Sequence, residues 1–586
     1  MLAEDSLANV LYIDLTKKRS WVERRSDLFE AYLGGAGVAI QLLLEKCPTG
    51  CDAYGEDNPI ILAVGPMTGL FPLASKTVAM FKSPLTGNLG ESHCGGRSAV
   101  AIRLAGYGAI VIEGRSTIPL WLSVKGNGGV AFRDAATLWG MNNTSTVGRI
   151  IRENESGAGL RSIMRIGRAG EKLIPYAAVM TETYRHFGRL GLGAVFGSKN
   201  LKALVVAGDR SLPVAGRKQY RALYDKIYDA AVQSPVMKKY HDLGTAENIL
   251  PLNEIGGLPT RNVQSGFFEG ARAISGEALA DGFLGRRLAC AHCPVGCIHI
   301  AALREPYEDE PYFYKTSMIS YDYELMYALG TMLGISDAKG AMELIDRVEA
   351  VGLDAMSTGV VLAWATEALE RGFISARDAG ELRLSWGDAA TYKQAVTRIV
   401  EQPSEFYRTL GQGVEVASAI YGGADFAMAL GKNEMPGYHT GPAAYLGFSM
   451  GARHSHLDNA GYSVDQKTLI KQPLAAEALA DSLLEEERWR QILSSLVVCF
   501  FARGIYKPEL VCEALGVSGF ALSLDDLNRL GREIHSEKFR FKIREGFTFE
   551  DLRLPARIFE TEAPVKGFDE AYIRRALAHV KEAVVA

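Results

Sequence analysis

The chain has 586 residues with a formal net charge of -4 at pH 7; 48% of the residues are hydrophobic and 23% are charged. This is the composition of a globular protein with enough chain for several domains, and so small a net charge excludes strong attraction to nucleic acid or to a membrane surface. Segment 1–21 has acids instead of a basic start and too short an apolar run for a signal peptide or a membrane anchor. We expect a cytoplasmic protein with no nucleic-acid or membrane partner.

The chain up to about residue 209 is rich in glycine and in short apolar segments that are separated by turn residues. Such segments are typical of β-strands. The expected strands are 60–65, 76–81, 98–106, 109–114, 119–124 and 201–208. We therefore predict a β-sheet domain over residues 1–209.

Helical periodicity begins at about residue 214. In segment 336–375 apolar residues recur three and four positions apart, and Gly372 ends the last run. Segment 411–430 marks a transition to a second mostly helical region. The prediction is an α+β protein with two mainly α-helical domains, 210–425 and 426–586, after the sheet domain. No short repeat or long linker is evident.

Three of the eight cysteines form a C-x2-C-x3-C motif at Cys290, Cys293 and Cys297. Thiolates at this spacing can bind several corners of one iron–sulfur cubane, and the Pro and Gly residues between them favour a tight, non-helical turn. A zinc site completed by His292 or His299 is an alternative, although zinc sites more often use two separated pairs. The third interpretation is purely structural: the three cysteines bind no metal and lie buried as free thiols near a turn.

A [4Fe-4S] cluster needs a fourth thiolate. Cys47 and Cys51 lie in a polar loop, Cys94 in a glycine turn, Cys499 after an apolar run and Cys512 in a short helical segment. The apolar surroundings favour Cys499, because a dry shell tunes the potential of such a cluster. Spacing alone leaves the choice open.

Two glycine-rich stretches, 65–100 and 184–206, combine turns with basic side chains. Freed backbone amides and cations suit a polyphosphate or a pyranopterin phosphate. Neither stretch has the dinucleotide-binding fingerprint, and each taken singly is also typical of a tight turn between strands. The basic residues are Lys76, Lys82 and Arg97 in the first stretch and Arg185, Arg189 and Lys199 in the second.

The ordered set of motifs resembles the aldehyde ferredoxin oxidoreductase family of tungsten and molybdenum bis-pterin enzymes along essentially the whole chain. The segments that carry the resemblance are "LYIDLTKKRSW", "YLGGAGVAIQLLLEK", "GPMTG" with "KSPLTG", "AGYGAIVIEG", "YRHFGRLGLGAVFGSKNLKA", "CAHCPVGC", "YALGTMLGISD" and "GLDAMSTG". The resemblance implies that two related β-sheets in the first domain form the base on which the pterins sit. It implies as well that two helical domains cover the pterins. It also implies that the cluster ligands are Cys290, Cys293, Cys297 and Cys499.

The resemblance assigns pterin contacts as well. They are Lys76, His93, Cys94, Gly95, Gly96, Arg185 and His186 in the first domain, Glu349, Gly352, Leu353 and Asp354 in a first D-x-x-G-L-[DC] motif, and Ser494 and Val498 in a second. Lys76 replaces a usual arginine and keeps the charge without the bidentate fork. Glu349 and Ser494 stand where the motif has Asp, and Val497 stands where it has Gly. Ser494 brings no charge, so we expect the second pterin to be held differently.

The resemblance places the catalytic pair at Glu324 and His456, with His454 as the neighbouring alternative for the histidine. Hydration and oxidation of an aldehyde need a proton acceptor near the substrate carbon and a donor that polarises the carbonyl oxygen. Without the resemblance, a helix cap and a hydrogen-bonded core histidine would be the preferred interpretations. Glu343 and Lys393 fall where some members bind a bridging iron; since lysine cannot serve there, we expect no bridging metal.

The implied activity is oxidation of aldehydes to carboxylic acids, with ferredoxin or a partner iron–sulfur subunit as electron acceptor. The implied cofactors are a tungsten or molybdenum bis-pyranopterin, a [4Fe-4S] cluster and a Mg2+ ion between the pterin phosphates. The pterin sulfurs bind either metal, so the sequence does not choose between them. Two alternatives stay open: a tungsten-dependent reductase subunit for an acyl-CoA or other substrate, and a non-catalytic iron–sulfur subunit. A homodimer and a heteromeric complex are both compatible with the sequence.

Overall fold

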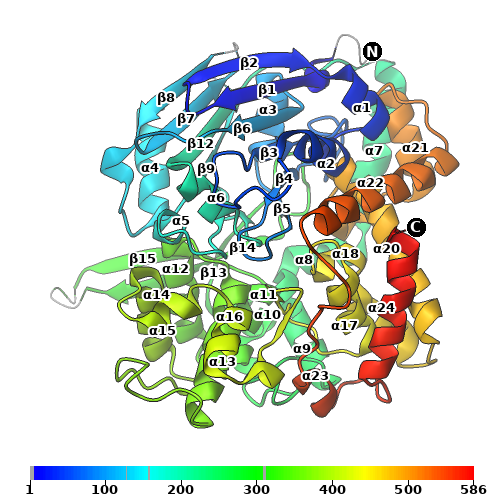
Figure 1. The fold of residues 1–586 in the computed structure, drawn as a ribbon. Coiled ribbons are helices and arrows are strands. Elements are labelled where there is room, and N and C mark those ends of the chain that lie inside the picture. The colour runs from blue at the N-terminus through cyan, green and yellow to red at the C-terminus, as the bar shows by residue number, and fades with distance from the viewer. Residues whose placement is uncertain are drawn as a thin grey trace.

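The structure is a computed structural model that describes residues 5–126, 129–155, 159–214, 216–307, 310 and 312–585. The strands of the first third of the chain gather at one end, and the helices that follow lie against them (Figure 1). This arrangement of a sheet-rich N-terminal part and a mainly helical remainder confirms the predicted α+β class. The proposed domain ends at residues 209 and 425 stay predictions.

The first sheet has six strands in the order β2-β1-β6-β3-β4-β5. Strand β6 runs parallel to β1, and all other neighbours are antiparallel. Every residue of β3 and β4 is buried, as expected for strands that are covered on both faces. The strands are β1 Asn9–Asp14, β2 Arg19–Arg24, β3 Ile60–Ala63, β4 Thr77–Lys82, β5 Leu89–Cys94 and β6 Ala109–Glu113.

The second sheet repeats this topology. Its order is β8-β7-β12-β9-β10-β11, with β12 parallel to β7 and the rest antiparallel. The two related sheets implied by the resemblance are thus confirmed. No repeat is evident in the residues themselves, because many different sequences satisfy the same apolar pattern and turn positions. The strands are β7 Leu120–Lys125, β8 Val130–Asp134, β9 Leu160–Ile166, β10 Val179–Met180, β11 His186–Phe187 and β12 Leu201–Gly208.

The two sheets meet at equivalent edges, because β5 and β11 are the corresponding last strands of the two repeats and contact each other. The two glycine-rich stretches therefore come together. The prediction of a strand at 98–106 is wrong: helix α3 spans Ser98–Ala105 and packs against β9 and β12. A short, wholly apolar run cannot be assigned by periodicity alone. The other helices of this part are α1 Ser26–Tyr32, α2 Gly35–Lys46, α4 Thr144–Asn154, α5 Arg168–Glu171 and α6 Leu192–Ser198.

The remainder is mainly helical, and local capping explains several helix ends. Helix α12 begins after the cap Asp337 and ends at Gly352, whose φ of 80° suits glycine; α13 then begins after the cap Asp354. Helices before residue 425 are α7 Arg217–Gln233, α8 Pro235–Leu243, α9 Ile249–Glu254, α10 Gly276–Gly282, α11 Tyr323–Leu329, α12 Ala338–Val351, α13 Ala355–Glu370, α14 Ala389–Glu401, α15 Glu405–Leu410 and α16 Val414–Tyr421.

Helices α17 to α24 complete the chain and pack beside the sheets and the earlier helices (Figure 1). They are α17 Pro442–Met450, α18 His456–Asn459, α19 Gly461–Val464, α20 Ala476–Ser495, α21 Pro508–Val517, α22 Leu524–Arg544, α23 Arg557–Glu560 and α24 Glu570–Val585. Within the described ranges, no helix combines the length and the apolar character that a bilayer crossing requires.

Two small antiparallel sheets interrupt the helices. The strands are β13 Leu284–Leu288, β14 Ile298–Pro306 and β15 Tyr314–Tyr321 in one sheet, and β16 Ala429–Leu430 and β17 Asn433–Glu434 in the other. The sequence analysis did not anticipate the three-stranded sheet, although it presents the cysteine motif: the loop from Cys290 to Cys297 joins β13 to β14.

Candidate redox site

The cysteine loop is held between two segments that are distant in the sequence. Ala291 N donates to Gly96 O at 2.8 Å, and Leu73 N donates to the carbonyl of His292 at 3.0 Å. Cys499 N in turn donates to Leu73 O at 2.9 Å. These backbone bonds bring the N-terminal sheet domain, the cysteine motif and the segment of Cys499 to one place.

The thiols expected to bind the cluster lie close enough to affect one another's pKa. Burial raises the pKa of Cys297 to about 11, against a lowering effect of Arg185, while Cys499 and Cys290 raise it further. Burial also raises the pKa of Cys293, with smaller contributions from Cys290, Cys499 and Cys297. The Arg185 guanidinium lies 3.9 Å from the Cys297 sulfur. Such thiols stay protonated unless cations compensate their charge, which is what iron would do.

The zinc alternative is poorly matched. His299 is fully buried, its Nε2 lies 3.0 Å from the carbonyl of His241, and its Nδ1 lies against Gly244. In the described ranges, no three His, Cys, Asp or Glu side chains are grouped closely enough to hold a single metal ion. A cubane fits the quartet better, because each of its thiolates binds a different iron.

Glycines 95 and 96 allow the close approach of the first sheet to the cysteine loop. A Cβ atom on Gly95 would lie 3.0 Å from Cys290 Sγ and 3.6 Å from Lys76 Nζ. Gly96 has a φ of 98°, and a Cβ there would meet Thr183 Oγ1 at 2.2 Å. The structure thus places Lys76 and both glycines beside the cluster thiols.

Glu324 and His456 face each other. His456 Nε2 lies 3.4 Å from Glu324 Oε1, and Glu324 Oε2 accepts from Gly437 N at 3.1 Å. Within the part of the chain that the structure describes, Glu324 Oε1 and His456 Nδ1 are buried without a hydrogen-bond partner. Asp322, not Glu324, caps helix α11 by accepting from Leu325 N.

Burial sets the protonation of this pair. It raises the pKa of Glu324 to about 8, against the lowering effect of the Gly437 N–H. It lowers the pKa of His456 to about 3, and the Arg189 and Arg453 charges act in the same direction. At neutral pH the protein therefore holds a protonated carboxyl beside a neutral imidazole, an arrangement suited to proton exchange.

Arg189 is a site residue that the sequence analysis did not assign. Its Nε donates to Asp354 Oδ2 at 3.1 Å and one Nη donates to the carbonyl of Glu434 at 2.7 Å. Among the described residues, its Nη1 is buried and without a partner. Asp354 also caps helix α13 and accepts from Ser357, and its pterin contact stays a prediction. The only signal in the sequence was a basic residue in a glycine-rich stretch.

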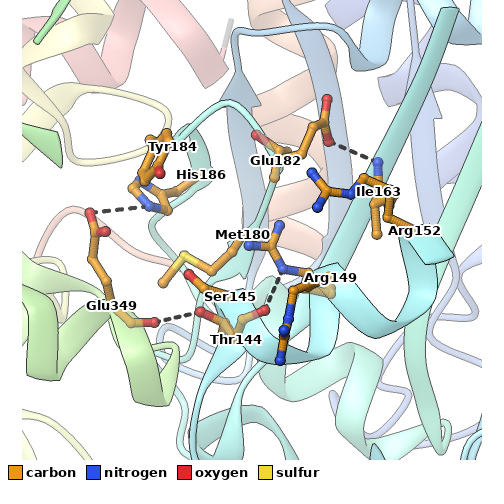
Figure 2. A pocket seen from close by; sticks show the side chains of 13 residues that line it. Thr144, Ser145, Arg149, Arg152, Ile163, Met180, Glu182, Tyr184, His186 and Glu349 are labelled. Atoms are coloured by element: carbon orange, nitrogen blue, oxygen red, sulfur yellow. Dashed lines mark hydrogen bonds and ion pairs between the residues drawn. The ribbon is translucent and has the colours of Figure 1, made fainter. Parts of the chain in front are cut away.

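Glu349 and His186 line a cavity of about 180 Å³ (Figure 2). His186 Nε2 lies 3.4 Å from Glu349 Oε1, and Thr144 Oγ1 donates to the Glu349 carbonyl at 3.0 Å. Burial raises the pKa of Glu349 to about 8 and lowers that of His186 to about 3. The structure therefore brings the first motif of the helical region against strand β11 of the second sheet.

The same cavity contains charged groups that the sequence analysis missed. Arg165 Nε donates to the Thr144 carbonyl at 2.7 Å, and Glu182 accepts from Ile163 N at 2.8 Å. In the described ranges, Arg165 Nη1, Glu182 Oε1 and Glu349 Oε1 are buried without a hydrogen-bond partner, although Glu349 Oε1 lies within ion-pair distance of His186. Burying such groups without hydrogen bonds costs free energy. The cavity is therefore suited to a polar ligand.

The second motif departs from the family pattern but keeps its backbone shape. Val497 has a φ of 56°, in the left-handed region where the motif has Gly, and its carbonyl accepts from Lys76 N at 3.2 Å. A β-branched residue there stores strain of about 1–3 kcal/mol. Ser494 and Val498 are buried at the end of helix α20 and just after it. Leu353 and Gly352 of the first motif contact the second sheet at Ala177 and Gly167.

His93 and Cys94 end strand β5. His93 Nε2 lies 2.7 Å from Glu91 Oε1, and Glu91 also pairs with Lys538 at 2.6 Å. Burial lowers the pKa of His93 to about 4, and it raises the pKa of Cys94 to about 12. The His93 side chain thus belongs to a buried ion-pair network, and its predicted pterin contact stays a prediction.

His454 lies close to His456 in the chain but has both ring nitrogens engaged. Nδ1 lies 3.0 Å from Phe448 O, and Nε2 lies 2.9 Å from Lys542 Nζ. We expect His454→Leu to lower the free energy of unfolding by about 1–3 kcal/mol, because it leaves the buried Lys542 without this acceptor. Thermal and denaturant unfolding would measure this. His456→Gln is the matched control and should unfold like the wild type; equal loss in both variants would contradict a structural role specific to His454.

Glu343 and Lys393 form an ion pair, and Glu343 also contacts Lys339 at 3.1 Å. The expectation that no bridging metal binds here stays a prediction.

Two sheets with matching edges, a half-buried quartet of thiols and a largely buried acid–imidazole pair are the features of a redox protein that binds a large polar cofactor. The model of the aldehyde ferredoxin oxidoreductase N-terminal domain matches residues 10–208, and the model of domains 2 and 3 of the same proteins matches residues 222–583. The chain belongs to the aldehyde ferredoxin oxidoreductase family.

Curated relatives agree with this assignment. The tungsten-containing aldehyde ferredoxin oxidoreductase of Thermococcus kodakarensis is 31% identical over 93% of this chain and 90% of its own length. The enzyme of the same name from Pyrococcus furiosus is 30% identical with the same two coverages. A solved structure, the active site complex BamBC of benzoyl coenzyme A reductase with 1,5-dienoyl-CoA, shares the fold: its TM-score is 0.80 at 21% identity, over 98% of this chain and 94% of that one.

Proposed function

We propose that this protein is a tungsten-pterin, [4Fe-4S] enzyme that oxidises aldehydes to carboxylic acids. One aldehyde and one water give one carboxylic acid, two protons and two electrons, and the electrons pass one at a time to ferredoxin or to a partner iron–sulfur subunit. The observation that carries the proposal is the buried pair of Glu324 and His456 in the same fold as the quartet of thiols. We place this reaction in the cytoplasm.

The residues present fit the cofactors. We assign the cluster to Cys290, Cys293, Cys297 and Cys499. In the described part of the chain, Glu349, Arg165 and Arg189 each have a buried polar atom without a hydrogen-bond partner, and these atoms suit the polar groups of a pterin. Lys76 with the Gly95–Gly96 turn suits its phosphate. When bound, the metal–pterin group supplies the two-electron acceptor for the substrate carbon. An electron-transfer subunit without a pterin would not need to keep these polar groups buried and unpaired.

Glu324 and His456 perform the proton transfers in this proposal. Glu324 accepts a proton at its free Oε1 as water adds to the carbonyl carbon, and its raised pKa makes it a stronger base once it is ionised. Neutral His456 donates a hydrogen bond to the carbonyl oxygen. The capping box of Ser455 and Asp458 fixes the backbone from which His456 projects.

Metal analysis of anaerobically purified protein tests the proposal. We expect about one tungsten, or molybdenum in its place, and about four irons per chain, together with aldehyde-dependent reduction of ferredoxin. Protein from the native host that contains the irons but neither tungsten nor molybdenum, and that does not reduce ferredoxin with any aldehyde, would favour the electron-transfer subunit instead.

A further inference from the structure

A cavity of about 960 Å³ lies next to the proposed catalytic pair and plays no part in the proton transfers above. Tyr438 and Tyr462 form part of its wall. The ring of Tyr438 lies 5.4 Å from that of His456, and the Tyr462 ring lies 6.1 Å from it. Only one layer of aromatic side chains therefore separates the cavity from His456.

The charges that line this cavity are unbalanced. Its basic residues are Lys226, Lys239, Lys467, Arg503 and Lys507, and its acids are Glu509 and Glu513. Two of these bases are neutralised, since Lys226 pairs with Glu513 at 3.0 Å and Lys239 pairs with Glu247 at 2.5 Å.

Three cations remain. In the described part of the chain, Lys467, Arg503 and Lys507 form no ion pair, and Arg503 donates only to the carbonyl of Phe500, at 2.9 Å. Glu509 is the single lining carboxylate without an ion pair in the same ranges. Cations that share a concave surface attract anions because low-dielectric walls concentrate the field.

The walls between these cations and the catalytic pair are flat and aromatic. Tyr438 and Tyr462 stack with ring centroids 4.0 Å apart, and Tyr240 stacks on Phe501 at 4.5 Å. Stacked rings of this kind suit a planar apolar body. The cavity thus offers an apolar stretch that begins near His456, together with unpaired positive charges.

The backbone of Lys467 is held in place by its local structure, and its side chain is exposed. It lies in a π-helical turn, Asp465–Leu469, a rare element that often marks functional sites. Asp465 anchors the turn, because its carboxylate accepts from Thr440 Oγ1 at 2.8 Å and from the N–H groups of Ala443 and Ala444 at 2.9 Å.

We propose that this cavity selects substrates with an anionic group, a carboxylate or a phosphate, at the end remote from the aldehyde. The anion binds among Lys467, Arg503 and Lys507, and the body lies along the tyrosines. The stacked rings of Tyr438 and Tyr462 part to admit the aldehyde carbon, which then reaches Glu324 and His456. This inference rests on the proposed aldehyde oxidation and adds the substrate class to it.

Two benzaldehydes that share the ring and differ in the charge of the para substituent test the selection. We expect 4-carboxybenzaldehyde to be oxidised with a kcat/KM about tenfold or more above that of 4-methylbenzaldehyde, the advantage expected of a hydrogen-bonded charge. The triple variant Lys467→Gln, Arg503→Gln, Lys507→Gln should lose this advantage and leave 4-methylbenzaldehyde within about twofold, because the neutral substrate makes no ion pair. Lys581→Gln, outside the cavity, is the matched control.

A binding measurement separates the two proposals. In calorimetric titration, terephthalate should bind the wild type more tightly than 4-methylbenzoate, and the triple variant should remove the difference. Coenzyme A is titrated alone for comparison. If it binds more tightly than terephthalate, the anion that the cavity selects is a phosphate; if it binds more weakly, the anion is a carboxylate. Oxidation of both aldehydes with equal efficiency overturns the charge selection. Selective terephthalate binding without oxidation of any aldehyde would overturn the proposed reaction and leave the anion site standing.

Discussion

Replacement of Glu324 by glutamine is expected to lower kcat for aldehyde oxidation by about 10²–10⁴, the range that a positioned acid–base group contributes. The amide oxygen can still accept from Gly437 N, so the fold should be kept, while the side chain can no longer take a proton. Steady-state kinetics with ferredoxin as acceptor, normalised to tungsten and iron content, would measure the loss. Activity within about twofold of the wild type would exclude Glu324 as the base, since general catalysis is worth far more.

The pH dependence of the rate of aldehyde oxidation provides a second test of Glu324. Burial raises the pKa of Glu324 to about 8, and a base must be ionised to act. The rate of aldehyde oxidation should therefore rise with pH through about 8 and level off above it, and Glu324→Gln should lack this rise. Glu349→Gln is a matched control, because burial raises the pKa of Glu349 to about 8 as well. That variant should lower cofactor content and keep the pH dependence.

Replacement of Cys499 by serine is expected to remove the iron–sulfur cluster. The remaining Cys290, Cys293 and Cys297 cannot bind all four corners of a cubane with thiolates. We expect iron to fall well below about four per chain, the load of one cubane, the charge-transfer absorption to disappear and electron transfer from aldehyde to ferredoxin to be abolished. Iron analysis and the visible spectrum of anaerobic protein would show this.

Cys512 provides the control for this experiment. It lies in helix α21, away from the four thiols, and Cys512→Ser should keep the iron and the spectrum. The pair of variants separates loss of a ligand from a general sensitivity to cysteine replacement. A Cys499→Ser protein with unchanged iron and spectrum would require another fourth ligand, and Cys94 would be tested next because its thiol interacts with Cys290.

The fold could be anticipated from the sequence where local rules decide it. The buried strands at 60–65 and 201–208, the helices over 336–375 and the end of the last of these helices just before Gly372 follow from apolar patterning and capping over a few residues. The same rules failed for Ser98–Ala105, where a short apolar run fits both a strand and a buried helix. They also missed the repeated sheet topology, which depends on pairing between distant strands.

The sequence by itself determined the cysteine triad, the order of the family motifs and hence the family, because these depend on residue type and spacing. Only the tertiary structure decided which groups meet. It set His456 against Glu324 while both nitrogens of His454 are engaged elsewhere, and it placed Cys499 against the loop of Leu73. Among the residues that the structure describes, it also left one buried nitrogen each of Arg189 and Arg165 without a hydrogen-bond partner. These juxtapositions arise from the packing of elements far apart in the chain, about which no local pattern carries information.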